Sequence, residues 1–178
     1  MTTNKIYMPF FLLLAMTLFS FSFFGVFSSP GVIECEGGGH TIRFEKWKFT
    51  KVEIPNKDIS QMKVALEINM KSLRTTTDYT ALERGIKKKK DWFNVKQYPT
   101  AQVLIEGAKK IEGNRYRAQA QLTLKGVTKK LPLEFSISEE MPYRVKGSFE
   151  MRRAKYGITG GGPSPVVPVR FEATLPTF

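Results

Sequence analysis

Cysteine and histidine are nearly absent from this chain of 178 residues, which contains one of each, Cys35 and His40. A single cysteine cannot form an intramolecular disulfide, so the hydrophobic core alone must hold the domain together. One Cys and one His cannot supply the three or four ligands of a zinc site without several carboxylates, so we expect no metal site. His40 stands beside the glycines 37–39 with no catalytic partner in a recognisable pattern. We therefore expect no catalytic residue and no enzymatic activity.

Nucleotide-binding patterns are also lacking. The glycine run 160–162 follows no strand-to-helix pattern and is typical of a turn rather than of a phosphate-binding loop. Acidic residues are scarce, 16 against 28 Lys and Arg, which gives a formal net charge of +12. Such a field attracts anionic lipid head groups or polyanions. Because the chain has no nucleic-acid recognition motif, and because we expect it to be exported for the reasons given next, we expect no nucleic-acid partner.

The expected export signal is the uncharged stretch 6–27, which is rich in Phe and Leu and follows Lys5. A short positive segment before an apolar stretch is typical of a secretory signal peptide, and we expect cleavage near Ser28. The stretch is also about long enough to span a bilayer, so an uncleaved anchor remains the alternative for residues 1–28. In both cases the positive amino end stays in the cytoplasm. We expect the rest of the chain in the periplasm or otherwise outside the cytoplasmic membrane.

Residues 29–39 are rich in Ser, Pro and Gly and end in three glycines, which predicts a flexible linker. Cys35 lies in this segment. It is either an inert residue in a loose stretch of chain or a thiol for an intermolecular disulfide or another reaction. From His40 onward there is no low-complexity stretch, internal repeat or linker. We expect residues 40–178 to form one domain, because about 150 residues is a common domain size.

The dominant pattern of this domain is strict alternation of apolar and polar residues, which is typical of strands with one buried face. It predicts strands over residues 64–71, 115–124, 131–137, 143–152 and 167–175, and a weaker strand over 41–50. Turn residues at Gly113-Asn114, Lys125-Gly126 and Met141-Pro142 lie between neighbouring runs, so these strands should pair antiparallel. Many short strands, each with one apolar face, must bury those faces together. An up-and-down barrel or a sandwich does so, and a barrel also removes exposed edges.

One segment breaks the alternation. Residues 80–83 form a capping box and residues 84–90 follow, which predicts a short helix ending near Asp91. This helix carries four consecutive lysines, Lys87, Lys88, Lys89 and Lys90. A solvated helix face is one interpretation of the run. The other is contact with an anionic membrane surface, where each basic side chain contributes about 1 kcal/mol.

Four short motifs occur in order between about residues 63 and 175. They are Ser72-Leu73-Arg74-Thr75, Asp91-Trp92-Phe93-Asn94-Val95-Lys96-Gln97-Tyr98-Pro99-Thr100, Leu122-Thr123-Leu124-Lys125-Gly126-Val127-Thr128-Lys129 and Arg153-Ala154-Lys155-Tyr156-Gly157-Ile158. With these motifs the chain resembles the YceI-like family. The family-motif positions are Asp91, Trp92, Phe93, Asn94, Tyr98, Pro99, Gly126, Arg153, Tyr156 and Gly157. Two features depart from the family: Lys155 stands where an acidic residue is usual, and the stretch before Lys63 is short and lacks the glycine-rich pattern, which leaves open whether the barrel closes there.

The resemblance implies an all-β fold, an extended antiparallel lipocalin-like β-barrel with one short helix. It also implies an elongated apolar cavity that takes up a polyisoprenoid, such as the tail of an isoprenoid quinone, with no cofactor required. The expected function is lipid binding. The alternative is a basic module with a packed core and no bound lipid, which contacts a membrane surface or another protein. Whether the chain forms a homodimer is left open.

The inward side chains decide between a cavity and a packed core. A barrel of about eight strands is either filled by its side chains or has room for one small ligand. The small residues Ala101, Ala118, Ala120, Gly147 and Ala173 should leave volume unfilled, whereas the aromatic residues could fill it as ordinary core. With the resemblance added we expect a lipid cavity. Its candidate residues are Leu66, Ile68, Met70, Phe93, Ala101, Val103, Ile105, Tyr116, Ala118, Ala120, Leu122, Leu133, Phe135, Val145, Phe149, Val169 and Phe171.

Overall fold

The computed structural model describes residues 31–76 and 80–176, and the leader expected at residues 1–28 lies outside this part of the chain. The strands are β1 (Gly31–Gly37), β2 (His40–Phe44), β3 (Trp47–Glu53), β4 (Lys63–Asn69), β5 (Leu73–Thr75), β6 (Thr100–Glu106), β7 (Lys109–Glu112), β8 (Arg115–Leu124), β9 (Val127–Ile137), β10 (Arg144–Arg152) and β11 (Val166–Thr174). The helices are α1 (Thr80–Lys88) and the short 3-10 helices η1 (Pro55–Lys57), η2 (Ile59–Gln61), η3 (Met70–Ser72) and η4 (Arg153–Tyr156). Within the described ranges, no helix has the length and apolar character needed to span a membrane.

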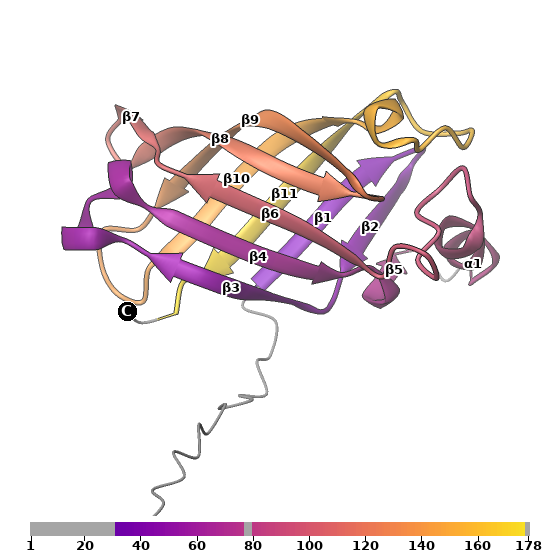
Figure 1. Cartoon of the computed structure of the whole chain (residues 1–178), viewed down its shortest axis with the longest axis horizontal. Coiled ribbons are helices and arrows are strands. Elements are labelled where there is room, and N and C mark those ends of the chain that lie inside the picture. The colour runs from indigo at the N-terminus through magenta and orange to yellow at the C-terminus, as the bar shows by residue number, and fades with distance from the viewer. Residues whose placement is uncertain (1–30, 77–79, 177–178) are drawn as a thin grey trace, which may run out of the picture.

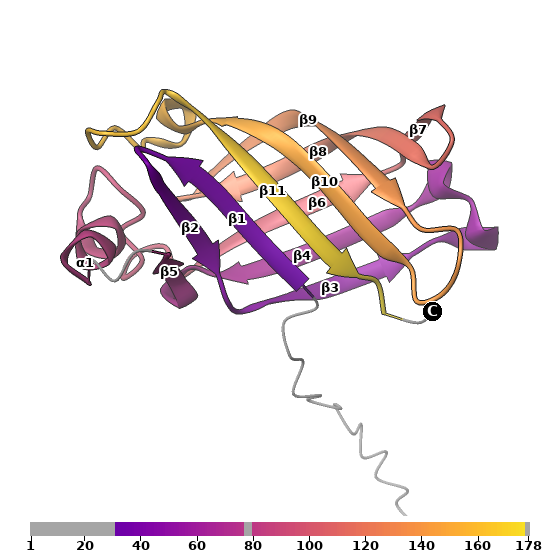
Figure 2. The same cartoon turned by 180° about the vertical axis from the view of Figure 1, so that it is seen from behind.

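The strands form one antiparallel sheet in the order β3-β4-β6-β8-β9-β10-β11-β1-β2-β5, and β7 adds to β8. The sheet curls round on itself, as Figures 1 and 2 show from opposite sides. The chain links the two sides of this order, because β5, the last strand, pairs with β2 and follows β4, the neighbour of β3, after the single turn η3. The all-β antiparallel barrel with one short helix is therefore confirmed.

The barrel has a seam along β3. Among the described residues β3 pairs with β4 alone, and its start lies near the start of β1 (Figure 2). One hydrogen bond crosses the seam, from Trp47 Nε1 to the carbonyl oxygen of Gly31 at 3.2 Å. In the described chain, ladder hydrogen bonds join β5 to β2 alone and β3 to β4 alone, so each of these end strands has one unpaired edge, and only the turn η3 links β5 to β4. The sequence left open whether the barrel closes at the short start of the domain, and in the described chain it is open along β3.

Most of the predicted strands and turns are present. The five strongly alternating segments fall on β4, β8, β9, β10 and β11. Gly113-Asn114 joins β7 to β8, and Lys125-Gly126 joins β8 to β9 with φ angles of 50° and 75°. Two consecutive residues with positive φ give the tight turn whose twist matches that of paired strands. The Met141-Pro142 bond lies in the loop between β9 and β10.

The prediction of one strand over residues 41–50 was wrong, because two strands occupy it. β2 pairs with β1 and β5, whereas β3 pairs with β4. The chain changes partner at Glu45 and Lys46. There Lys46 N–H donates to Ser72 Oγ at 2.9 Å and Glu45 N–H donates to Ser72 O at 3.4 Å. Ser72, a member of the first family motif, therefore fixes the corner that separates the two strands.

The prediction of a flexible linker over residues 29–39 was wrong for residues 31–39, whereas residues 29 and 30 lie outside the described part of the chain. Residues 31–37 form β1, which lies between β11 and β2. Ile33 and Cys35 alternate with Val32 and Glu34 and are only 6% and 5% exposed, so this short strand buries one face like the others. Gly37 ends β1, and Gly38 and Gly39 form the β1–β2 turn with φ of 62° and 76°. The alternation of residues 32–35 was overlooked because Pro30 and Gly31 precede it and glycines 37–39 follow it.

The helix begins at Thr80 and ends at Lys88, before the predicted end near Asp91. The chain turns back on it there, because Phe93 N–H donates to Ile86 O at 3.2 Å and Val95 N–H donates to Lys87 O at 2.8 Å. Ile86 is buried against the barrel end.

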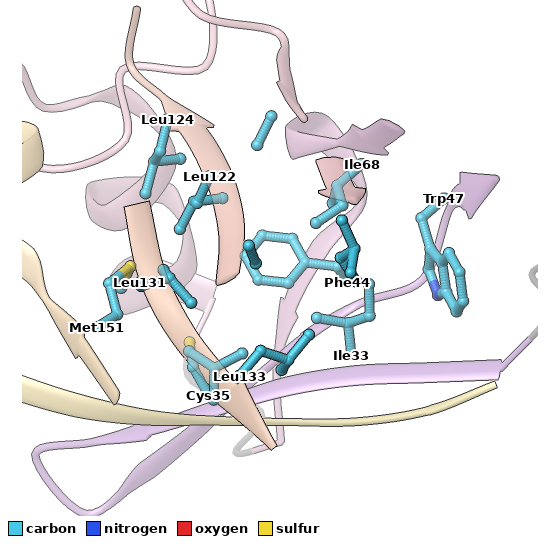
Figure 3. Close-up of a cluster of buried hydrophobic side chains, with 14 of the residues drawn as sticks. Ile33, Cys35, Phe44, Trp47, Ile68, Leu122, Leu124, Leu131, Leu133 and Met151 are labelled. Carbon is cyan, nitrogen blue, oxygen red and sulfur yellow. The ribbon is translucent and has the colours of Figure 1, made fainter. Parts of the chain in front are cut away.

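The side chains inside the barrel form one apolar cluster, part of which Figure 3 shows: Leu122 and Leu124 of β8, Leu131 and Leu133 of β9, and Ile33 and Cys35 of β1 share one interior.

Candidate functional site

An apolar cavity of about 110 Å³ lies inside the barrel. Side chains from β1, β2, β3, β4, β6, β8, β9, β10 and β11 line it, from Met62 and Val64 near η2 to Phe93 and Met151 near α1. Every lining side chain is hydrocarbon or carries sulfur, apart from the indole nitrogen of Trp47. All the candidate cavity residues lie on its wall except Tyr116 and Ala118. That they bind lipid stays a prediction.

Several lining residues were not predicted. Some belong to β1, which was predicted as linker, or to β2 and β3, which were predicted as one weaker strand, and most of the others continue alternating faces that were already predicted as apolar. These residues are Ile33, Cys35, Phe44, Trp47, Phe49, Met62, Val64, Leu124, Leu131, Met151, Ala173 and Leu175. Leu124, Leu131 and Met151 already lie on the apolar faces of the predicted strands 115–124, 131–137 and 143–152, so following each face to the end of its strand would have found them.

The cavity is small for a long lipid tail. Drug-sized ligands occupy pockets of about 300–1,000 Å³, and a dry apolar cavity of about 150 Å³ accepts benzene. A longer chain must therefore displace side chains from the interior. Three lining residues are methionines, Met62, Met70 and Met151, whose unbranched side chains adapt readily. Two more, Phe149 and Phe171, face inward yet are only partly buried.

The expectation that Gly147 leaves space unfilled was wrong. The ring of Phe171, on the neighbouring strand, lies over Gly147, so a Cβ there would overlap the ring and come within 2.6 Å of Glu134 O. Ala101, Ala120 and Ala173 do line the cavity, as expected of small residues on an inner face. Ala118 is 5% exposed but is not on the cavity wall, so it is packed against other side chains.

Cys35 lies on the cavity wall and is not a surface thiol. Burial, with a smaller effect from the charge of Glu34, raises its pKa to about 12. Because the thiolate is the reactive form, a thiol with this pKa is unreactive at neutral pH. Of the two interpretations of Cys35, the inert one fits, although the residue is inert through burial and not because the segment is loose.

Tyr116 belongs to a second, polar pocket at the end of the barrel remote from α1. Its ring stacks on Phe135, with 5.6 Å between centroids and 19° between planes. Phe135 lines the apolar cavity, whereas Tyr116 lines this second pocket of about 190 Å³. Loop residues around Ile54 to Ile59 and 137–143 complete its wall. The structure therefore places one predicted site residue at the boundary between an apolar and a polar space.

The family-motif residues gather around the opposite end, near α1, and hold loops together. The guanidinium of Arg153 donates to the carbonyl oxygens of Gly160, of Pro163 at 2.9 Å and of Ser164 at 3.1 Å. It also lies 5.8 Å from the ring centroid of Trp92. The Trp92 indole occupies the place that a side chain on residue 160 would need, so glycine is required there.

Other contacts connect the remaining motifs. The Lys125 ammonium donates to Lys90 O at 2.8 Å and to Gly157 O at 2.7 Å, and desolvation, opposed by the charge of Asp91, lowers its pKa. Tyr98 packs on Gly126, whose Cβ would lie 3.4 Å from the Tyr98 ring. Of the family-motif positions only Phe93 lines the cavity. The motifs therefore shape one end of the barrel and mostly do not contact its interior.

The lysine run divides into two parts. Lys87, near the end of α1, pairs with Glu83 at 2.7 Å and is 16% exposed. Partial burial opposes ionisation of Glu83, but Lys87 and Arg74 outweigh it and lower the pKa of that carboxyl. Lys88, Lys89 and Lys90 are exposed. Within the described residues, no cluster of three or more His, Cys, Asp or Glu could hold a metal ion.

This fold is similar to that of known proteins. The family model of the YceI-like domain matches residues 32–175. Among solved structures, Burkholderia cenocepacia BcnA has a TM-score of 0.72 at 17% identity, covering 82% of this chain and 96% of that one. A polyisoprenoid binding domain from Saccharophagus degradans, implicated in plant cell wall breakdown, has a TM-score of 0.57 at 16% identity, covering 83% and 96%. The Campylobacter jejuni YCEI protein has a TM-score of 0.57 at 16% identity, covering 76% and 85%.

No curated protein matches the chain. The solved structures are too distant in sequence to show more than the fold. The family model, by contrast, covers most of the chain, including β1, and agrees with the four motifs. The chain belongs to the YceI-like family.

Proposed function

We propose that the barrel binds the apolar tail of an amphipathic lipid, a polyisoprenoid such as the tail of an isoprenoid quinone, reversibly and without a covalent bond. The observation that carries this proposal is the apolar cavity, lined from nearly every strand. The polyisoprenoid binding named for the Saccharophagus degradans domain supports the same class of ligand. No cofactor is needed, because the binding requires only burial of the tail.

Burial alone can supply the affinity. Removing apolar surface from water contributes about 25 cal/mol per Å². A long prenyl chain has ample apolar surface, so it needs no specific polar contact to bind. Displacing interior side chains opposes binding, and the three cavity methionines make that displacement easier than rigid branched side chains would.

The direct test is mass spectrometry of organic extracts from the gently purified mature domain. We expect a lipid with a long prenyl tail at a stoichiometry near one per chain. An extract without lipid, from protein that also fails to take up an added prenyl lipid, would favour the alternative function.

That alternative is a basic module that contacts a membrane surface, and the charge of the α1 end is the observation that favours it. Helix α1, residues 89–99, the β8–β9 turn and η4 contain only two carboxylates, Glu83 and Asp91. The exposed cations on these same elements are Arg84, Lys88, Lys89, Lys90, Lys96 and Lys155. Lipid binding and membrane attraction are compatible, and we propose that this basic end assists docking on anionic lipid.

Replacing Lys88, Lys89 and Lys90 together by Gln should weaken binding to anionic vesicles by at most about 3 kcal/mol at low salt, since each cation contributes about 1 kcal/mol. The melting temperature should hardly change, because these side chains are exposed. Lys87 is left in place because its ion pair with Glu83 supports the helix. The control is Gln at Lys51, Lys63 and Lys109, which removes the same charge from the other end. Equal weakening by both triple variants would assign the effect to net charge alone.

We also propose that the domain functions outside the cytoplasmic membrane, as the leader in residues 1–28 suggests. Cell fractionation with N-terminal sequencing tests this. We expect the barrel in the periplasmic or membrane fraction. Recovery of full-length soluble protein in the cytosol, with its leader intact, would contradict export.

A further inference from the structure

The polar pocket remote from α1 has a wall that differs in kind from that of the apolar cavity. We call it the vestibule, defined by Lys57, Lys110, Asn114, Tyr116, Glu139 and Tyr143 among its lining residues. It lies where η1, the β7–β8 turn and the β9–β10 loop meet, at the end of the barrel opposite α1 (Figure 1). Its lysine, amide, carboxylate and phenol groups contrast with the hydrocarbon wall of the cavity.

Strand register connects the vestibule to the cavity. Lys110 of β7 pairs with Tyr116 of β8, and Tyr116 pairs with Phe135 of β9. Directly paired residues point to the same face of a sheet, so all three side chains are on the inner face. Phe135 is part of the cavity wall, and its ring stacks on that of Tyr116. A molecule that extends from the cavity past this stack therefore reaches the vestibule.

The charged groups of the vestibule favour an anion. Two ammonium groups, Lys57 and Lys110, and one carboxylate, Glu139, line it, so the charged groups of its wall sum to a positive charge. Lys57 and Asn56 have φ angles of 58° and 54°, an unfavourable conformation for residues with a side chain. Lys57 N–H donates to Ile54 O at 3.1 Å and Asp58 N–H donates to Pro55 O at 2.9 Å, which fixes this turn beside the pocket. Such conformations are often kept where a side chain must be presented to a ligand.

We infer that the vestibule binds the anionic head group, of the phosphate type, of the lipid whose tail occupies the cavity. This inference rests on the proposed function. The head group lies between Lys57 and Lys110, the Tyr116 ring separates it from the apolar interior, and the tail extends towards α1. Head-group selection is then a property of the vestibule, and tail binding is a property of the cavity.

The test compares two probes with the same tail, geranylgeranyl phosphate and geranylgeraniol, on the delipidated mature domain. Tryptophan fluorescence follows binding, because Trp47 lines the cavity. We expect the double variant Lys57→Gln with Lys110→Gln to bind the phosphate about tenfold more weakly, as loss of a charge-assisted hydrogen bond predicts. Its affinity for the alcohol should not change. Lys109→Gln is the matched control, since Lys109 pairs with Arg117 on the outer face.

Each other outcome has one meaning. If the parent binds neither probe, the proposed function fails. If it binds both probes equally, or if Lys109→Gln weakens phosphate binding as much as the double variant does, the head-group inference is overturned while tail binding stands. Inorganic phosphate alone, at the same concentrations, should leave the fluorescence unchanged. A response to it as strong as that to geranylgeranyl phosphate would assign the vestibule to a free anion and would also overturn the inference.

Discussion

Ala120→Trp should give a folded barrel that no longer retains lipid. Ala120 is 2% exposed, lies on the cavity wall, and pairs with Leu131 on one side and Ile105 on the other. An indole at this position would occupy the space where the tail is expected. Because that space is not filled by protein, the loss of stability should be modest. Melting curves and mass spectrometry of extracted lipid measure the two effects on the same preparation.

Ala118→Trp is the comparison for this variant. Ala118 is on the same strand and is buried, but it is not on the cavity wall. Its indole has no cavity to enter, so we expect an overpacking cost of typically about 1–3 kcal/mol or more. If Ala120→Trp is destabilised as strongly as Ala118→Trp, and the parent carries no lipid, the interior is a packed core and the lipid-binding proposal fails.

Arg153→Ala should be the most destabilising change at the α1 end. The guanidinium donates to three backbone carbonyls and lies over the Trp92 ring, and its removal leaves those carbonyls without their donors. Because Arg153 is only partly buried, we expect a loss of about 2–4 kcal/mol in the free energy of unfolding. For a domain of this size, that loss lowers the melting temperature by roughly 4–16 °C. Thermal denaturation followed by circular dichroism checks it.

Two further variants separate the causes. Arg152→Ala removes the same charge from the preceding, exposed position and should leave the melting temperature nearly unchanged. Arg153→Lys should have a melting temperature between those of Arg153→Ala and the parent, since an ammonium cannot direct several donors in the fixed geometry of a guanidinium. Lipid content per folded molecule should match the parent in every case, because Arg153 is not on the cavity wall. A parent-like melting temperature for Arg153→Ala would show that the loops near α1 do not depend on it.

The alternation of apolar and polar residues predicted most of the barrel, because a strand with one buried face has an apolar residue at every second position. It failed at β1, where glycines and a proline surround a strand too short for its period to stand out. It also failed at residues 41–50, where the apolar positions change phase between Phe44 and Trp47 and the chain divides into β2 and β3 at the corner made by Ser72. That corner depends on a contact between residues distant in sequence, which no local pattern records.

The cavity residues were predicted better than their surroundings. Inward side chains follow from alternation, but whether a small residue leaves space depends on the strand beside it. Phe171 lies over Gly147, whereas Ala120 faces the cavity. The vestibule could not be predicted at all, because Lys57, Lys110 and Glu139 come from three separate segments that only the barrel brings together. Similarly, the motifs identified the family correctly, but the sequence did not show that their residues hold loops together through hydrogen bonds and packing contacts.

The seam along β3 has a mechanical consequence. A barrel with every strand paired on both sides has a circumference set by its strand number and stagger, so its bore cannot widen unless ladder hydrogen bonds break. Between β3 and β1 the described chain has the single bond from Trp47 to Gly31 in place of a ladder. Radial expansion can therefore be taken up at this one line, while the other strands keep their register. The cavity of about 110 Å³ can then widen to fit a bulkier ligand without the loss of any strand pairing.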